Sequence, residues 1–193
     1  MIPHPIKIGI FGSAEGDFSK IQHLILELGH ELGKKNITVI TGGATGLPYQ
    51  IAKVASENGA QVWGYSPAAN EKKHKELFPD NSVEIFTKLF FVPESYPLKD
   101  NLKASQKYRN VSSTFHCDAG IIISGRWGAL NEFTNLFDMG KVIGVLTGSG
   151  GIADLLPHLH EQIHKKNSAV VLFDSSPKRL IDKIIRTLDN NDI

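Results

Sequence analysis

Residues 119–132 read AGIIISGRWGALNE. The first five, 119–123, form an unbroken apolar run, which is typical of a parallel strand buried on both faces. A glycine-rich turn follows at 125–128, and apolar residues then recur at helical spacing from Leu130 to Phe137. This stretch therefore predicts a buried strand, a tight turn and an amphipathic helix in succession.

The same succession recurs along the rest of the chain. Apolar runs predict further strands at residues 6–12, 37–41, 61–66, 83–92, 142–146 and 169–173. Apolar residues at helical spacing predict helices at about 18–32, 47–58, 98–115, 151–166 and 180–188. This alternation predicts a three-layer, Rossmann-like α/β fold, with a mostly parallel sheet of about six or seven strands and helices on both faces. No repeat or linker interrupts the chain, so we expect residues 1–193 to form a single domain.

The composition narrows the classes of function. The 193 residues carry a formal net charge of +1, so the basic excess that a nucleic-acid partner normally requires is missing. No apolar run approaches the ~18 residues of a membrane span, and the first residues do not have the pattern of a signal peptide. The single cysteine, Cys117, rules out an internal disulfide. We therefore expect a cytoplasmic protein with no nucleic-acid or membrane partner.

Glycine-rich turns at 42–46, 125–128 and 148–151 each follow a predicted strand. In open α/β sheets, ligands bind beyond the carboxyl ends of the strands. Glycines let the backbone approach a ligand, and the N-terminus of the next helix attracts phosphate. The first turn is equally consistent with a purely structural connection, and the third is expected to be a flexible loop. The candidates for phosphate or nucleotide binding at the first strand end and the first turn are Gly12, Ser13, Gly42, Gly43, Thr45 and Gly46.

The second turn adds a carboxylate. Glu132 is expected about one turn into the helix that follows the turn, with its side chain directed back towards it. A carboxylate there is placed for acid–base or electrostatic chemistry beside a phosphate or sugar. The alternative is that Glu132 only stabilises the first turn of the helix. The binding candidates at this turn are Gly125, Arg126, Trp127, Gly128 and Ala129.

Both turns resemble those of the Lonely Guy family of nucleotide phosphoribohydrolases, formerly called lysine decarboxylases. That family has Gly-Gly-x-x-Gly-Leu-Met after its second strand, where this chain has GGATGLP at 42–48. It later has Pro-Gly-Gly-x-Gly-Thr-x-x-Glu, where this chain has SGRWGALNE at 124–132. The family's catalytic arginine corresponds to Arg109, 23 positions before Glu132. The resemblance covers roughly residues 6–146 and implies a nucleotide-binding domain.

The resemblance implies cleavage of the N-glycosidic bond of a nucleoside 5′-monophosphate, giving free base and ribose 5-phosphate. Glu132 would stabilise the positive charge that develops on the ribose and orient the attacking water. Arg109 would hold the phosphate or polarise groups around the ribose, and Trp127 would stack on a base or lie in a subunit interface. The ligand is then a nucleotide or another phosphorylated small molecule, and neither a metal nor a cofactor is expected.

Three departures from the family pattern favour a second hypothesis. Arg126 replaces a glycine, Ala129 replaces the threonine and Ser124 replaces the proline. The related molybdenum-cofactor carrier proteins have the same scaffold and bind without hydrolysing. The alternative function is therefore that of a non-catalytic nucleotide sensor or cofactor carrier.

A zinc-protease motif also occurs in the sequence. Residues 160–164 read HEQIH, which on a helix would place two histidines one turn apart. Leu155, Leu159 and Ile163 are expected to pack this helix on the sheet, and no Gly-x-x-His follows the motif. We therefore expect an ordinary helix flank without a metal.

The resemblance also predicts assembly into a homodimer or a higher homo-oligomer. Family members pack helices near the active site against each other, and this chain has Trp127 and Phe133 beside the second turn. Size-exclusion chromatography with light scattering at micromolar concentration is expected to give at least twice the chain mass. A monomer under these conditions would contradict the prediction.

Overall fold

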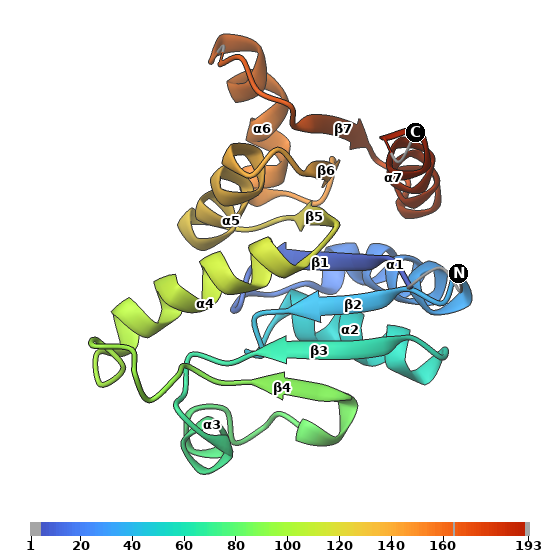
Figure 1. The fold of residues 1–193 in the computed structure, drawn as a ribbon. Helices are drawn as coiled ribbons and strands as arrows, with labels where there is room; N and C mark the ends of the chain where they lie inside the picture. The colour runs from blue at the N-terminus through green and yellow to red at the C-terminus, as the bar shows by residue number, and fades with distance from the viewer. Residues whose placement is uncertain (1–4, 164, 192–193) are drawn as a thin grey trace.

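The computed structural model describes residues 5–163 and 165–191 (Figure 1). The strands are β1 (Lys7–Gly12), β2 (Thr38–Thr41), β3 (Gln61–Tyr65), β4 (Lys88–Phe90), β5 (Ala119–Ile123), β6 (Val142–Leu146) and β7 (Val170–Asp174). The α-helices are α1 (Gln22–Lys34), α2 (Leu47–Glu57), α3 (Glu71–Leu77), α4 (Leu102–His116), α5 (Trp127–Asp138), α6 (Gly151–Gln162) and α7 (Pro177–Asn191). Two short 3-10 helices, η1 (Ser19–Ile21) and η2 (Val83–Ile85), precede α1 and β4.

The seven described strands form one sheet in the order β4-β3-β2-β1-β5-β6-β7. Every neighbouring pair is parallel, so all the carboxyl ends lie at one edge. In the middle of the sheet, Gly9 of β1 lies opposite Ile40 on one side and Gly120 on the other. The predicted α/β fold is confirmed, and the sheet is parallel throughout rather than mostly parallel. The strand order grows outwards in both directions from β1, and this reversal decides where a ligand site forms.

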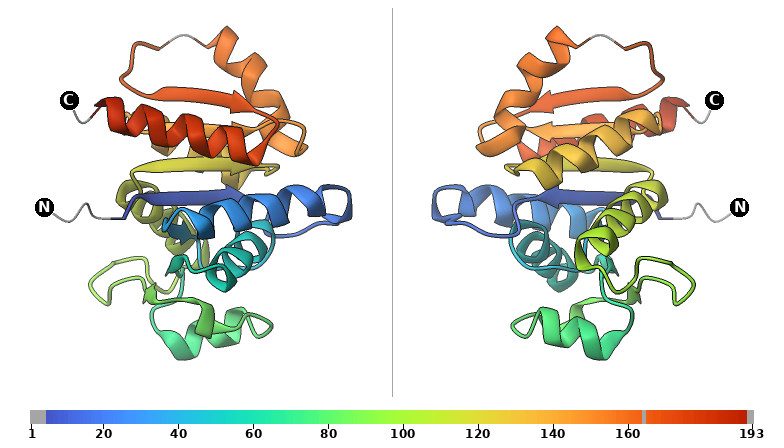
Figure 2. Two further views of the ribbon diagram at one scale, coloured as in Figure 1. Left: turned by 90° about the vertical axis from the view of Figure 1, so that its right-hand side faces the viewer. Right: turned by 90° about the vertical axis from the view of Figure 1, so that its left-hand side faces the viewer.

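Helices cover both faces of the sheet (Figure 2). The first face is covered by α1, α2 and α7, and its core includes Ile8, Ile25 and Ile184. The second face is covered by α4, α5 and α6, and its core includes Phe11 and Leu136. Most of these helices are amphipathic, with buried apolar residues three or four positions apart, whereas α4 buries the polar residues Ser105, Asn110, Ser113 and Thr114. The result is the three-layer arrangement that the sequence predicts.

Two elements begin later than the sequence predicts. The helix predicted from residue 98 begins at Leu102, because the Asn101 side chain accepts a hydrogen bond from the Ala104 N–H and caps it there. The strand predicted over 83–92 is confined to Lys88–Phe90. Its first part is η2, whose start the Ser82 side chain caps by accepting from the Glu84 N–H. In both places a local polar cap overrides an apolar pattern.

The helix that carries the zinc-protease motif is shorter than predicted. It ends at Gln162, and Ile163 has an extended backbone, so the prediction of a helix to about residue 166 is wrong. His164, the second histidine of the motif, lies outside the described residues. Of the two histidines of the motif, the described helix contains His160. Within the part of the chain that the structure describes, no helix has the length and apolar character needed to cross a bilayer.

The third glycine-rich turn is held in place from both ends. Asp154 accepts hydrogen bonds from the Gly148 and Gly150 N–H groups at 2.6 and 3.1 Å. The Ser149 hydroxyl donates to the Leu146 carbonyl at 2.6 Å and accepts from the Ser124 N–H at 2.7 Å. The turn therefore supports the second turn, which begins at Ser124, and is not the free loop that its glycines suggest.

We predict that Ser149→Ala lowers the free energy of unfolding by about 1–3 kcal/mol, because it leaves two backbone groups in a buried position without their partner. Urea unfolding followed by circular dichroism measures the change. Thr134→Ala is the control, since the Thr134 hydroxyl bonds to the Asn131 carbonyl on an exposed part of α5. Its effect is expected to stay within about 0.5 kcal/mol. Equal effects of the two substitutions would contradict the bracing role of Ser149.

Candidate functional site

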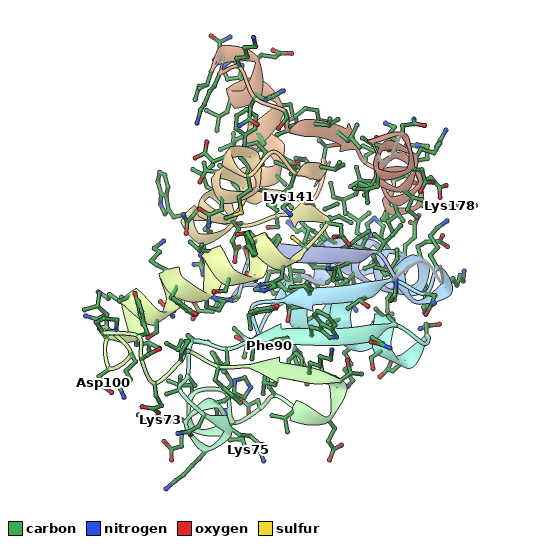
Figure 3. All side chains as sticks on the ribbon, in the orientation of Figure 1. Lys73, Lys75, Phe90, Asp100, Lys141 and Lys178 are labelled. Carbon is green, nitrogen blue, oxygen red and sulfur yellow. The ribbon has the colours of Figure 1, made fainter. Side chains whose placement is uncertain are left out.

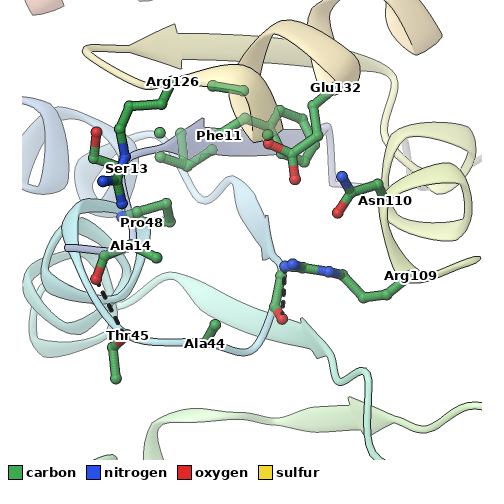
Figure 4. A pocket seen from close by; sticks show the side chains of 15 residues that line it. Phe11, Ser13, Ala14, Ala44, Thr45, Pro48, Arg109, Asn110, Arg126 and Glu132 are labelled. Atoms are coloured by element: carbon green, nitrogen blue, oxygen red, sulfur yellow. Dashed lines mark hydrogen bonds between the residues drawn. The ribbon is translucent and has the colours of Figure 1, made fainter. Parts of the chain in front are cut away.

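A cavity of about 160 Å³ lies at the carboxyl end of β1, where the strand order reverses. Its walls come from the end of β1, the first turn, α4, the second turn and the start of α5 (Figure 4). The lining residues are Ile10, Phe11, Gly12, Ser13, Ala14, Gly42, Ala44, Thr45, Pro48, Arg109, Asn110, Arg126, Gly128, Ala129 and Glu132. The cavity is therefore in the position that open parallel sheets use for ligands.

Gly42 gives Arg109 its place in the cavity wall. The Arg109 Nη1 donates to the Gly42 carbonyl at 2.9 Å. A Cβ added to Gly42 would lie 1.4 Å from the same Nη1, so a larger residue here would displace the guanidinium from this position. The first glycine of this turn therefore serves to accommodate an arginine side chain from α4. From the sequence, Gly42 was predicted to bind a phosphate or nucleotide.

The loop that follows β1 joins the two glycine-rich turns. The Ser13 carbonyl accepts from the Leu47 N–H at 2.9 Å, and its hydroxyl accepts from the Gly125 N–H at 3.2 Å. Gly46, at a φ of +86°, lies so close to this loop that an added Cβ would be 2.4 Å from the Ser13 carbonyl oxygen. The N–H of Leu47 is thus already paired, and the next residue is a proline, so the start of α2 has few donors left for an anion.

The start of α5 is free to bind an anion. The helix begins after Arg126, and no side chain caps it. Within the described residues, the N–H groups of Trp127, Gly128 and Ala129 have no hydrogen-bond acceptor. Such unpaired groups, together with the helix dipole, attract negative charge. The exposed Arg126 side chain lies at the same end of the cavity, where its Nη2 is 3.4 Å from a Glu15 carboxylate oxygen.

Glu132 and Arg109 face each other across the cavity (Figure 4). The Glu132 side chain is buried, with 6% of the residue exposed, and nothing in the described part of the chain hydrogen-bonds to its carboxylate. Burial raises the pKa of this carboxyl group to about 7, although the positive charges of Arg109 and Lys107 oppose the shift. The carboxyl group is therefore divided between its neutral and ionised forms near neutral pH, as a general acid or base needs.

Arg109 keeps donors available for a ligand. Its Nε is buried and has no hydrogen-bond partner among the described residues. Burial lowers the pKa of the guanidinium and the charge of Glu132 raises it, but an arginine stays protonated in either case. A buried cation with one carbonyl partner suits an acceptor-rich ligand, such as a phosphate or a sugar.

Asn110 is a cavity residue that the sequence analysis missed. Its Nδ2 donates to the Asn131 Oδ1 at 3.0 Å, while its buried Oδ1 has no partner within the described chain. The Asn131 Oδ1 also accepts from the Lys107 Nζ at 3.3 Å. A buried asparagine in a helix next to Arg109 is a weak sequence signal, because asparagine is a poor helix former and is more often exposed.

The structure brings most of the predicted site residues together. Gly12, Ser13, Gly42, Thr45, Arg109, Arg126, Gly128, Ala129 and Glu132 all line the cavity. Four others do not: Gly43, Gly46 and Gly125 shape the turns behind the wall, and Trp127 projects into solvent with 84% of it exposed. That any of these residues contacts a ligand stays a prediction. In the described residues, no group of three or more His, Cys, Asp or Glu side chains is arranged to hold a metal ion.

Fold and cavity together define a doubly wound α/β protein with a polar cavity at the reversal of strand order. The chain belongs to the SLOG cluster4 family, whose model matches residues 5–181. The match extends beyond the predicted resemblance at both ends. It identifies the SLOG superfamily and leaves the narrower Lonely Guy assignment as a proposal.

Solved structures with this fold share little sequence with the chain. TM1055, a structural-genomics target, has a TM-score of 0.73 at 19% identity, with 94% of this chain and 99% of that chain covered. The molybdenum cofactor binding protein from Rippkaea orientalis has a TM-score of 0.68 at 16% identity, with coverages of 96% and 98%. DNA processing protein A from Streptococcus pneumoniae has a TM-score of 0.67 at 16% identity, but this chain covers 62% of it. These likenesses establish the fold alone.

The raised pKa of Glu132 predicts a pH-dependent stability. Between pH 4.5, the ordinary value for a glutamate, and pH 7, the folded protein retains a proton that the unfolded chain has lost. The free energy of unfolding should therefore fall as pH rises through this range, by about 3 kcal/mol from this group. In Glu132→Gln this loss should disappear, so the variant should gain stability over the wild type at pH 8 and not at pH 4.

Urea unfolding at pH 4, 6 and 8 measures the effect. Glu57→Gln, which changes an exposed glutamate at the end of α2, is the control and should follow the wild-type pH dependence. If Glu132→Gln and the wild type differ by the same amount at all three pH values, the Glu132 carboxyl group titrates as an ordinary surface group.

Proposed function

We propose that this protein hydrolyses the N-glycosidic bond of a nucleoside 5′-monophosphate, releasing the free base and ribose 5-phosphate. The observation that carries the proposal is the buried Glu132 carboxylate, which has no hydrogen-bond partner in the described chain and faces Arg109 across the cavity. A folded protein gains nothing in stability from such a group. It is the arrangement expected of a side chain kept for a ligand.

The two ends of the cavity suit the two ends of such a substrate. The 5′-phosphate is placed at the start of α5, where unpaired N–H groups and Arg126 supply positive charge. The ribose then lies between Glu132 and Arg109, with Asn110 beside it. The unpaired Asn110 Oδ1 and Arg109 Nε offer one acceptor and one donor to ribose hydroxyl groups.

The chemistry follows from where charge develops. As the bond between C1′ and the base nitrogen breaks, its electron pair leaves with the base and positive charge builds on the ribose ring. The ionised Glu132 stabilises that charge in a site with little water, where an electrostatic contact is strong. A water molecule adds its oxygen to C1′, and Glu132 accepts the proton that the water loses. A pKa near 7 allows Glu132 to release that proton to solvent afterwards, and the departing base takes up a proton from solvent.

A second candidate function is that of a binding protein without hydrolysis. Ala129 presents a methyl group to the cavity where the Lonely Guy pattern has a threonine hydroxyl, so one donor to the substrate is missing. Two of the structures with this fold carry the names of molybdenum cofactor binding and carrier proteins. A carrier of a phosphorylated ligand would use the same anion-binding end and would leave Glu132 without a catalytic role.

We predict that Glu132→Gln lowers kcat about a hundredfold and changes nucleotide affinity less than threefold, because the lost contact acts mainly in the transition state. Arg109→Ala should weaken both binding and turnover. In the wild type, kcat/KM should rise with pH through about 7, where Glu132 ionises. The assay is chromatographic detection of free base from a panel of nucleoside 5′-monophosphates.

Glu57→Gln is the control and should retain wild-type kcat. Binding of a nucleotide without release of any base would reject hydrolysis and favour the carrier. Hydrolysis that survives Glu132→Gln would leave the protein an enzyme but would remove Glu132 from its mechanism.

A further inference from the structure

A second hollow, of about 140 Å³, lies next to the first along the carboxyl edge of the sheet. Its walls come from the ends of β3 and β4 and from α4, and they include Tyr65, Phe90, Tyr108, Ser112 and His116 (Figure 3, where Phe90 is labelled). It is thus rich in aromatic rings, whereas the first cavity is lined mainly by small and charged residues.

Arg109 lines both spaces and is the partition between them. Its guanidinium lies over Gly42 at the end of β2, the strand between β1 and β3. Neighbouring strands are about 4.8 Å apart, so the ends of β3 and β4 lie about 10 and 14 Å from the end of β1 along this edge. A ligand bound at the start of α5 has to pass beside the Arg109 guanidinium to enter the second hollow.

The aromatic wall is packed and already shaped. The Tyr65 ring stacks on Phe90 with a centroid distance of 4.7 Å and on His116 at 5.4 Å. Tyr108 on α4 is held by Tyr96, with a centroid distance of 4.8 Å. These contacts hold the rings in place as a rigid aromatic wall beside the hollow, against which a flat group can pack.

The same hollow offers polar groups at its edges. In the described chain, the hydroxyl groups of Tyr65 and Tyr108, which both line the hollow, form no hydrogen bonds. Burial raises the pKa of Tyr65 to about 12, so its hydroxyl remains a donor at neutral pH. The aromatic rings of the hollow suit a flat ligand group, and the hydroxyl groups at its rim suit a group with donors and acceptors along its edge. A heteroaromatic ring has both features, whereas an aliphatic group has no polar edge to pair with these hydroxyl groups.

We propose that this second hollow is the subsite for the base of the bound nucleotide, with Arg109 at the junction between base and ribose. The assignment rests on the proposed function for the phosphate and ribose ends of the ligand. It adds the prediction that affinity for the base comes from the ends of β3 and β4 and from α4. The same arrangement would hold for a carrier that binds a nucleotide without cleaving it.

Ser112→Leu tests the assignment, because it places a larger side chain in the second hollow from α4 without altering any residue of the first cavity. Calorimetry should compare a nucleoside 5′-monophosphate with ribose 5-phosphate, which has no base. Both should be measured in otherwise wild-type protein and in the Glu132→Gln background, where turnover is expected to be slow. Ser112→Leu should weaken nucleotide binding at least about tenfold and change ribose 5-phosphate binding less than about twofold.

Two further variants make the result interpretable. Gln106→Leu adds the same side chain on the exposed face of α4 and should leave both affinities unchanged. Tyr108→Ala removes part of the aromatic wall without filling the hollow, so it tests the assignment even if Ser112→Leu folds poorly. It too should weaken nucleotide binding selectively.

The outcomes separate the two proposals. Equal weakening of both ligands, or unchanged nucleotide binding in both Ser112→Leu and Tyr108→Ala, would reject the base subsite and leave the phosphate and ribose site standing. Wild-type affinity no higher for the nucleotide than for ribose 5-phosphate would reject it as well. Binding of neither ligand by the wild type would overturn the subsite and the proposed function together.

Discussion

The reversal of strand order at β1 is the constraint on which the other features depend. Chain growth in opposite directions from β1 leaves the loops after β1 and β5 side by side, with no crossover helix between them. The Ser13 backbone and side chain bond to the first turn and the second turn at this point. Ser13 thus fixes the spacing between the first and second glycine-rich turns. The third turn supports the second turn through the Ser149 hydroxyl group. The positions of the cavity walls are therefore set by hydrogen bonds that Ser13 and Ser149 form with backbone groups of the turns.

The glycines of the first and second turns have different physical roles, which the sequence motif alone does not distinguish. Gly42 leaves space for the Arg109 guanidinium, and Gly46 allows the chain to pass close to the Ser13 loop at a positive φ. Gly128, in contrast, faces open space, so its missing side chain leaves room beside the free N–H groups of α5. The glycines of these two turns therefore differ in what they make room for: an arginine side chain at Gly42, the backbone of another loop at Gly46, and open space at Gly128.

Short-range patterns predicted the fold well, because each helix and strand buries a face that its own sequence encodes. The strand at 119–123 and the end of α5 before Gly140, which has a φ of +67°, follow directly from the sequence. The pairing of Arg109 with Glu132 came from a family pattern, and the structure places both in one cavity. Asn110 and the hollow beyond Arg109 were not predictable, because they depend on how α4 lies across strand ends far away in the sequence. The late start of α4 was missed because the Asn101 side-chain cap outweighs periodicity.

The free energy that it costs to bury the Glu132 carboxyl group explains why the site has this shape. A buried carboxyl group without a partner opposes folding once it ionises, so the protein retains it at the expense of stability. The nearest compensation is the field of Arg109 and Lys107, which lowers the pKa without forming an ion pair in the described chain. A direct ion pair between Arg109 and Glu132 would stabilise the fold more and would also occupy both groups. Gly42 prevents this by anchoring the guanidinium on the opposite wall, so the space between the two charges remains open for a ligand.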